Sequence, residues 1–329
     1  MSVSAQKSSI TVVTPFNREY NSQPTITLNG SQIPVEPSTK ILGTTFDRGM
    51  TFKPHITELT SKTKSRLNVM RALTATTFGQ QKESILNLYK QFVRPVLTYA
   101  STAWSPDLAN THTEALQRVQ NSALRIATGC TKSTPIPHLH AETKVLPIGD
   151  HANMRGTQFF SGAADPQHPC HHLHHAAPDP RNIHRTPATH YSNLLNQIPP
   201  KPPRRTDKSW IHEQFVAEYL SQIPANSLLG EPPPLIADSE SSLPRESRVH
   251  LARLRCGHHP SLLTYQNRIN PATDPTCRYC GTAPETVPHL LEDCSSLSVL
   301  RAAHGVHQTS HLWSRPAETI EFLRSAGLL

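Results

Sequence analysis

A run of apolar residues at helical spacing between Lys82 and Cys130 constrains the fold of this chain more than any other feature. An apolar stripe of this width on a helix has to be buried against another part of the protein. Pro95 interrupts the run and predicts a kink or a split, because proline removes one backbone donor and crowds the carbonyl four residues earlier. The first half of the stripe consists of Ile85, Leu88, Tyr89, Phe92, Val96, Leu97, Ala100, Ala103 and Trp104.

A second helix is expected after a short connector at residues 105–110. Thr111 and Glu114 have the spacing of a capping box at its start, and Gly129 is a suitable C-terminal stop. The short connector predicts that the two helices fold into a hairpin.

A third helix is predicted to begin at Pro54 and to extend to Leu73, with apolar residues along one side. Positive charges lie away from this side and can either contact phosphates or form a solvated face, and the sequence leaves both readings open. The cations considered for nucleic-acid contact in this helix are Lys62, Lys64, Arg66 and Arg71, and Arg118 and Arg125 in the helix after Thr111 join them.

The sequence pattern of the first fifty residues predicts short β-strands. The strands are expected at Ile10–Thr14, in a hairpin over Thr25–Val35, and at Lys40–Phe46. The hairpin should turn at Asn29-Gly30, since both central residues of a type I′ turn need a positive φ.

The composition is uneven along the 329 residues. Thirty prolines, twenty histidines and a hydrophobic content of 36% indicate that part of the chain is not packed. Residues 166–243 are expected to be a proline-rich, disordered linker with one short helix at Asp207–Ile223. No apolar run approaches the ~20 residues of a membrane helix, so we expect no membrane partner and an intracellular location, in the nucleus, the cytoplasm or both.

Positive charge gathers in the first half of the chain. Residues 1–150 hold 16 Lys+Arg against 9 Asp+Glu, whereas residues 151–329 are nearly balanced with 16 against 15. A basic half of this kind makes a polyanion the first partner to consider, and a solvated basic surface without a partner is the alternative.

The most specific local pattern is Cys277-x2-Cys280-x8-His289-x4-Cys294. Two thiolates from a tight turn and a second Cys/His pair can close a tetrahedron around a soft divalent ion. A complete set of four ligands leaves no open coordination position, which favours structural Zn²⁺ over a catalytic metal. A short helix is expected to carry His289 and Cys294.

A basic helix is predicted at residues 245–255, immediately before the cysteine pattern. Four arginines in eleven residues invite phosphate, and apolar residues show that one side is packed. Arg248 and Arg255 are the two candidates for nucleic-acid contact, with mere solvation as the alternative.

An ordered series of these segments resembles the end of the palm and the thumb of reverse transcriptases from non-LTR (LINE, jockey-like) retrotransposons. The resemblance covers residues 1–165 and again 245–300, and it extends to the CCHC pattern. It implies that Leu42-Gly43 lies in a hairpin that grips the primer and that the helices lie along a template–primer duplex. The segments that carry it are Lys40–Asp47, Thr51–Ile56, Tyr89–Ser101, Trp104–Pro106 and Gln120–Ile126.

The resemblance implies a parent enzyme that is an RNA-directed DNA polymerase. Its chemistry needs paired carboxylates holding two metal ions, so Mg²⁺ is expected in the full-length parent enzyme alone. This chain has no Asp-Asp dipeptide, and no catalytic residue is therefore assigned to it. We expect a truncated fragment that retains non-sequence-specific binding to RNA or DNA. The alternatives are a domesticated zinc-containing protein-interaction scaffold and a nonfunctional relic, and the oligomeric state stays open.

The expected fold is mainly α with a few N-terminal β-strands, and it comprises a helical thumb-like bundle, the linker and a small zinc-binding module. Four domains are predicted: a palm remnant at 1–53, a helical thumb-like domain at 54–165, the His/Pro-rich linker at 166–243, and the basic helix, CCHC module and C-terminal helix at 244–329.

Overall fold

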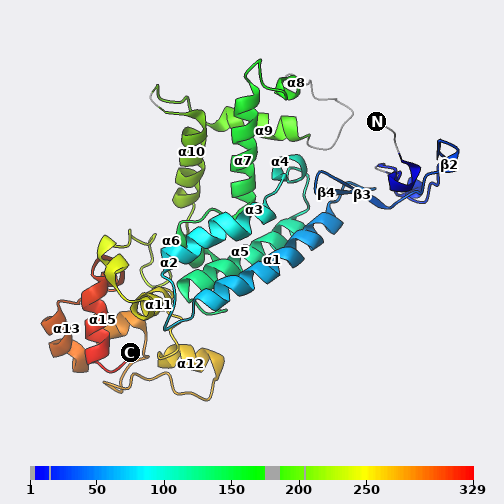
Figure 1. Ribbon diagram of the computed structural model, residues 1–329. Coiled ribbons are helices and arrows are strands. Elements are labelled where there is room, and N and C mark those ends of the chain that lie inside the picture. Colours follow the sequence, from blue (N-terminus) through cyan, green and yellow to red (C-terminus); the bar gives the residue numbers. More distant parts are fainter. Residues whose placement is uncertain (1–3, 15, 175–185, 204) are drawn as a thin grey trace. The chain divides into compact units, whose positions relative to one another are not determined.

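The protein is mainly helical with a few short strands near its N-terminus, as the sequence predicts, and these strands form two β-hairpins (Figure 1). The computed structural model describes residues 4–14, 16–174, 186–203 and 205–329. The chain divides into two compact units, each assembled from three separate stretches of sequence. These units cut across the four predicted domains, since distant segments pack together.

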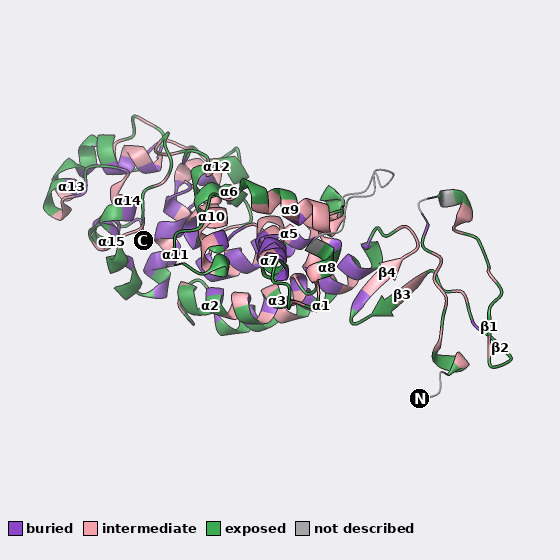
Figure 2. Cartoon of the chain, turned by 90° about the horizontal axis from the view of Figure 1, so that it is seen from above, coloured by how far each residue is buried: buried purple, intermediate pink, exposed green. Residues whose placement is uncertain are grey.

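The first hairpin forms where the sequence predicts it. Strands β1 (Thr27–Leu28) and β2 (Ser31–Gln32) pair antiparallel around Asn29 and Gly30, whose φ angles are 53° and 79°. Asparagine and glycine tolerate this left-handed conformation, which a type I′ turn requires. Most of this hairpin is exposed (Figure 2).

The single strand predicted at Lys40–Phe46 is wrong, because the chain reverses inside it. Strands β3 (Ser38–Ile41) and β4 (Thr44–Asp47) pair antiparallel, with Leu42 and Gly43 at positive φ in the turn. The predicted strand at residues 10–14 is reduced to one isolated bridge in the structure. A hairpin at Leu42-Gly43 agrees with the expectation from the family resemblance.

Asp47 organises the loop between β4 and the next helix. Its carboxylate accepts hydrogen bonds from the Thr51 amide (3.1 Å), the Thr51 hydroxyl (2.9 Å) and the Phe52 amide (2.7 Å). Met50 and Phe52 both have positive φ, which is costly for these side chains. The three bonds to one carboxylate hold the loop in this conformation and fix the start of helix α1 (Lys53–Leu73).

The long apolar run splits near Pro95, as predicted. Helix α2 (Lys82–Leu88) passes into a π-helical turn, η3 (Tyr89–Val93), which relieves the crowding that a proline causes in an α-helix. Short helices α3 (Arg94–Leu97) and α4 (Ser101–Trp104) follow.

Helix α5 (Asn110–Thr128) is the second predicted helix. It begins at Asn110, so Thr111 lies inside its first turn and not at the capping position. Gly129 ends the helix as predicted, with φ 70° and its amide donating to the Arg125 carbonyl (2.8 Å).

The first unit contains Met1–Arg66, Val93–Gln120 and Pro147–Val216. In this unit the hydroxyls of Ser105 and Tyr191 lie 3.1 Å apart, and Gln158 donates to the Lys208 carbonyl (2.8 Å). Besides β1–β4, α3 and α4, its elements are η1 (Ala5–Lys7), η2 (Asn17–Glu19), α7 (Ile148–Ala163), α8 (His171–His174) and α9 (Pro187–Gln197), and α1, η3, α5 and α10 (Asp207–Ser221) contribute residues to both units.

The region predicted as a linker holds more helix than expected. Helix α10 matches the predicted short helix, but α9 (Pro187–Gln197) was not predicted. Thr186 caps α9 by accepting from the Thr189 amide (3.2 Å), and Tyr191 is fully buried. A threonine followed by proline is the local signal for this start, and the surrounding prolines obscured it.

The second unit contains Leu67–Phe92, Asn121–Leu146 and Ala217–Leu329. Its apolar core gathers residues from the last eighty positions of the chain around Cys277 and Cys294. Besides α2, its elements are α6 (Ile136–Thr143), η4 (Asp238–Ser242), α11 (Arg245–Leu254), α12 (Leu263–Ile269), η5 (His289–Asp293), η6 (Ser295–Leu297), α13 (Ser298–His304), α14 (His311–Ser314) and α15 (Pro316–Ser325).

Helix α7 supplies a test of the packing in the first unit. A Cβ on Gly156 would lie 2.0 Å from Cε1 of Tyr191, whereas a Cβ on Gly162 meets nothing within 4 Å. We expect Gly156→Ala to destabilise the protein by about 1–3 kcal/mol because the Tyr191 ring must move. Gly162→Ala is the matched control and should be neutral or slightly stabilising. Thermal unfolding measures both, and equal midpoints for the two variants would contradict the packing of α9 on α7.

Candidate metal centre and the buried ion pairs beside it

The four residues of the CCHC pattern come together in the second unit. Their ligand atoms all lie within 4.8 Å of one another. The sulfurs of Cys277 and Cys294 are 3.9 Å apart, and the Cys280 sulfur lies 3.3 Å from Nε2 of His289. The spacing in the sequence therefore predicted a real cluster of three thiols and one imidazole.

A tight turn presents the first two cysteines. The Cys277 amide donates to the Ala283 carbonyl (2.8 Å), and the Gly281 amide donates back to the Cys277 carbonyl (2.8 Å). Gly281 has φ 67°, a conformation that glycine adopts without steric cost. The turn points both sulfur atoms to the same side.

A π-helical turn, η5 (His289–Asp293), positions the other two ligands. The Cys294 amide donates to the His289 carbonyl (2.7 Å), a bond across five residues that brings the two side chains together. Leu290 and Leu291 in the same turn are buried in the core. The predicted short helix is present, and Cys294 follows directly after its last residue.

Glu285 fixes the cysteine turn and was not predicted from the sequence. Its carboxylate is fully buried and accepts three hydrogen bonds from Arg278, at 2.8 Å from Nε, 2.8 Å from Nη2 and 3.1 Å from the amide. It also accepts the Leu263 amide (3.0 Å). Since Arg278 lies between Cys277 and Cys280, this ion pair holds the turn against α12. An acid eight residues after the first cysteine is the only local signal for it.

Arg301 supports the opposite pair of ligands. Its Nη1 donates to the carbonyl of Cys294 (2.6 Å) and to that of Leu290 (3.3 Å), and the side chain is almost fully buried. The guanidinium therefore closes the end of the π-helical turn. Both halves of the cluster are held by an arginine outside the ligand set.

The residues suit a soft divalent metal ion. Three sulfurs and one imidazole nitrogen can supply all four ligands of a tetrahedral metal site, which would leave no open position for a reacting molecule. Hydrogen bonds from Thr282 lower the pKa of Cys280 to about 6, while burial raises the pKa of Cys294 to about 11. A bound cation would favour the thiolate form of all three cysteines.

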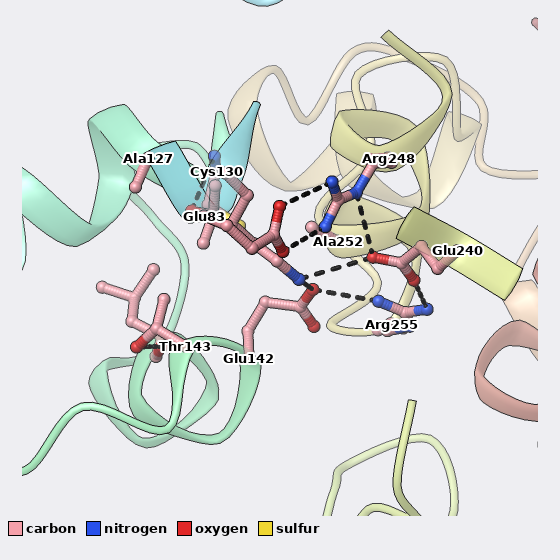
Figure 3. A network of polar contacts seen from close by, with 12 residues as sticks. Glu83, Ala127, Cys130, Glu142, Thr143, Glu240, Arg248, Ala252 and Arg255 are labelled. Carbon is pink, nitrogen blue, oxygen red and sulfur yellow. Dashed lines mark hydrogen bonds and ion pairs between the residues drawn. The ribbon is translucent and has the colours of Figure 1, made fainter. Parts of the chain in front are cut away.

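The arginines of the predicted basic helix face the protein interior. Arg255 has no exposed surface, and its guanidinium donates to Glu142 (2.9 Å) and to Glu240 (Figure 3). It also donates to the Leu312 carbonyl (2.7 Å). Its guanidinium also lies over the Trp313 ring, 5.6 Å from the centroid. Arg255 is therefore not available to a nucleic acid, in contrast to the sequence expectation.

Arg248 is nearly buried as well, with 6% of its surface exposed, and it pairs with acids. It donates to Glu83 (2.8 Å) and lies 3.6 Å from Glu240 (Figure 3). Lys82 completes the cluster, with contacts of 3.1 Å to Glu142 and 3.4 Å to Glu240. Three cations and three carboxylates balance one another, so this cluster needs no external anion.

The two remaining arginines of this helix bind backbone carbonyls. Arg245 donates to four of them, those of Ala75 (2.5 Å), Gln80 (3.0 Å), Ala127 (3.1 Å) and Ile126 (2.9 Å). Arg253 donates to the Gly129 carbonyl (2.8 Å). Carbonyls at the end of α5 and in the loop before α2 lack helical partners, and these guanidinium groups satisfy them.

The cluster determines the ionisation of Glu142. Burial raises its pKa, but Arg255 and Lys82 outweigh burial and hold the pKa at about 2. The same carboxylate raises the pKa of Lys82 and of Arg255 against their own burial. All three groups therefore stay charged at neutral pH.

The other cations singled out from the sequence lie on α1 and α5. Lys62, Lys64, Arg71 and Arg118 are exposed, while Arg66 and Arg125 are half-buried. Among their contacts are those of Lys62 with Glu58 (2.5 Å), Arg71 with Asn68 (2.7 Å), Arg118 with Glu114 (3.8 Å), and Arg125 with the carbonyls of Thr131 (3.3 Å) and Thr134 (3.2 Å).

Comparison with known proteins identifies the class that the chain resembles, the RNA-directed DNA polymerases of non-LTR mobile elements. It is 30% identical over 135 residues to the RNA-directed DNA polymerase from mobile element jockey of Drosophila funebris, and 27% identical over 135 residues to that of Drosophila melanogaster. It is 23% identical over 144 residues to a probable RNA-directed DNA polymerase from transposon X-element of Drosophila melanogaster. These matches confirm the resemblance found in the sequence.

The matches cover a limited part of each protein. They include 41–44% of this chain and 15–16% of the length of the relatives. No family model and no solved structure matches the chain. Among the described residues, every helix is too short or too polar to cross a membrane.

The ion-pair cluster predicts a specific acid sensitivity. The pKa of Glu142 is lowered from 4.5 to about 2, so its contribution to stability is complete above pH 4.5 and is lost as the pH falls toward 2. Glu142→Gln should cost about 3 kcal/mol at neutral pH because it leaves Lys82 and Arg255 with too few carboxylates. The variant should also lose less stability than the wild type between pH 4.5 and pH 2.

Urea unfolding at several pH values measures this effect. Glu114→Gln is the matched control, since Glu114 is 68% exposed and makes one long contact of 3.8 Å with Arg118. We expect that control to stay within about 0.5 kcal/mol of the wild type. An equally small effect of Glu142→Gln would show that the cluster is not formed in solution.

Proposed function

We propose that this chain binds the sugar–phosphate backbone of RNA or DNA without reading sequence, as a relative of non-LTR reverse transcriptases. The observation that carries this proposal is the two-sided character of α1. Its cations Lys62, Lys64 and Arg71 are exposed, while Leu67 and Met70 on another side of the helix are buried. A helix anchored in this way can present its cations to phosphates at fixed positions.

The spacing of these cations supports contact with successive phosphates. Lys64 and Arg71 are seven residues apart in one helix and therefore lie on the same face, about two turns from each other. Lys62 pairs with Glu58, and burial is slight there, so a phosphate can replace this acid as its partner. Arg118 on α5 is the further exposed cation of the proposed surface.

The proposal assigns no polymerase activity to these residues. Nucleotide addition needs neighbouring carboxylates that hold two metal ions, and the sequence contains no Asp-Asp dipeptide. The proposed partner is a template–primer duplex or another RNA or DNA, held by its backbone. Such a partner is found inside the cell, in the nucleus or the cytoplasm.

We also propose that the metal of the CCHC cluster is Zn²⁺ in a structural role. Support comes from the ligand chemistry, because three thiolates and one imidazole in a closed tetrahedral set are typical of structural zinc. Glu285 and Arg301 would then hold the two halves of the site in place whether or not a nucleic acid is bound.

Titration of a labelled template–primer duplex at increasing salt tests the binding proposal. The logarithm of the binding constant should fall linearly with the logarithm of the salt concentration. Removing both cations in Lys64→Ala/Arg71→Ala should reduce the magnitude of this slope by about two. Mg²⁺ and nucleotides added to the same complex should give no template-dependent product.

Lys208→Ala is the control, since Lys208 is an exposed lysine on α10 outside the proposed surface. It should leave the slope unchanged. Binding without salt dependence would instead favour a protein-interaction scaffold, and primer extension would overturn the assignment of the chain as inactive.

A further inference from the structure

Helix α11 (Arg245–Leu254) has two faces that serve two different parts of the second unit. On one face, Leu251 and Leu254 belong to the apolar core that contains the ligands Cys277 and Cys294. Arg255, directly after the helix, joins the same region through the Leu312 carbonyl and the Trp313 ring. This face of α11 is therefore part of the metal module.

The other face of α11 contacts segments more than one hundred residues earlier in the chain. Arg245 binds the carbonyls of Ala75, Gln80, Ile126 and Ala127, which belong to the loop before α2 and to the end of α5. These carbonyls would be left without partners if α11 moved away.

Close packing accompanies these hydrogen bonds. Gly129 lies so near Val249 that an added Cβ would be 2.5 Å from its Cγ2 atom. Nε2 of His138 lies 2.9 Å from the Ala252 carbonyl, which ties α6 to the same face. The contact is thus continuous along the helix.

Buried ion pairs also join the C-terminal segment to the early segments. Lys82 and Glu142 come from the early segments, while Glu240, Arg248 and Arg255 come from the C-terminal segment. Separation of the two segments would break all of these pairs at once. Loss of one partner from a buried pair costs about 3–5 kcal/mol.

We infer that α11 couples metal binding at the CCHC cluster to the stability of the helical segments 67–92 and 121–146. The inference rests on the proposed zinc site. Metal binding by four ligands that are apart in the unfolded chain supplies folding free energy to the module core. Because Leu251 and Leu254 are part of that core, zinc also holds α11 in position, and α11 closes the ends of α5 and α2. Metal binding at the CCHC module thus stabilises the helices that pack against α11.

Hydrogen exchange of the full chain, with Zn²⁺ bound and after its removal by a chelator, tests this coupling. Zinc removal should lower amide protection by at least about tenfold in residues 277–294 and also in residues 74–83 and 124–146. Helix α7 in the first unit should keep its protection. Loss of protection confined to residues 263–305 would overturn the inference and leave the zinc proposal intact.

A variant separates coupling from folding of the metal site. Arg245→Ala should retain one Zn²⁺ per chain, yet protection at residues 124–128 should no longer depend on zinc. Arg118→Ala on the exposed face of α5 is the matched control and should respond to zinc as the wild type does. A wild-type chain that binds no Zn²⁺ would contradict the zinc site and the coupling together, whereas the duplex-binding proposal would stand.

Discussion

The second unit depends on the burial of Arg255 between Glu142 and Glu240. A guanidinium without exposed surface is tolerated only when carboxylates and carbonyls replace its water, and here two acids and the Leu312 carbonyl do so. These partners come from α6, η4 and α14, so one side chain requires three elements to meet. Such a cluster contributes less to net stability than its short distances suggest, but it strongly disfavours any arrangement that separates its members.

This burial changes the role that we assign to the basic helix, from phosphate binding to internal packing. Four arginines in one short basic segment are typical of phosphate binding, yet the arginines of α11 and Arg255 directly after it bind carboxylates and the carbonyls at helix ends. The positive charge that the sequence displays is therefore of two kinds. The cations of α1 lie on the surface, and those of α11 hold the interior together.

Local patterns in the sequence predicted local structure well. The cluster of Cys277, Cys280, His289 and Cys294, the turn at Asn29-Gly30, the split near Pro95 and the stop at Gly129 all follow from spacing or from the steric properties of one residue. Each of these features is determined within about twenty residues.

The errors concern contacts over long distances in the sequence. Arg255 and Glu142 are 113 residues apart, and Arg248 and Glu83 are 165 apart, so no spacing rule connects them. The reversal at Leu42-Gly43 is a local exception, because Leu42 adopts a positive φ that its side chain disfavours. The role of Glu285 could not be predicted either, because it depends on the complete burial of its carboxylate, which the sequence does not reveal.

Arginine-specific chemical labelling read by mass spectrometry tests the division between surface and interior cations most directly. Arg118 should be modified rapidly, and a bound duplex should slow its modification, because its side chain is 68% exposed. Arg248 and Arg255 should stay unmodified until the protein unfolds, with or without nucleic acid. Modification of these two at the rate of Arg118, together with protection by the duplex, would contradict the internal role of α11.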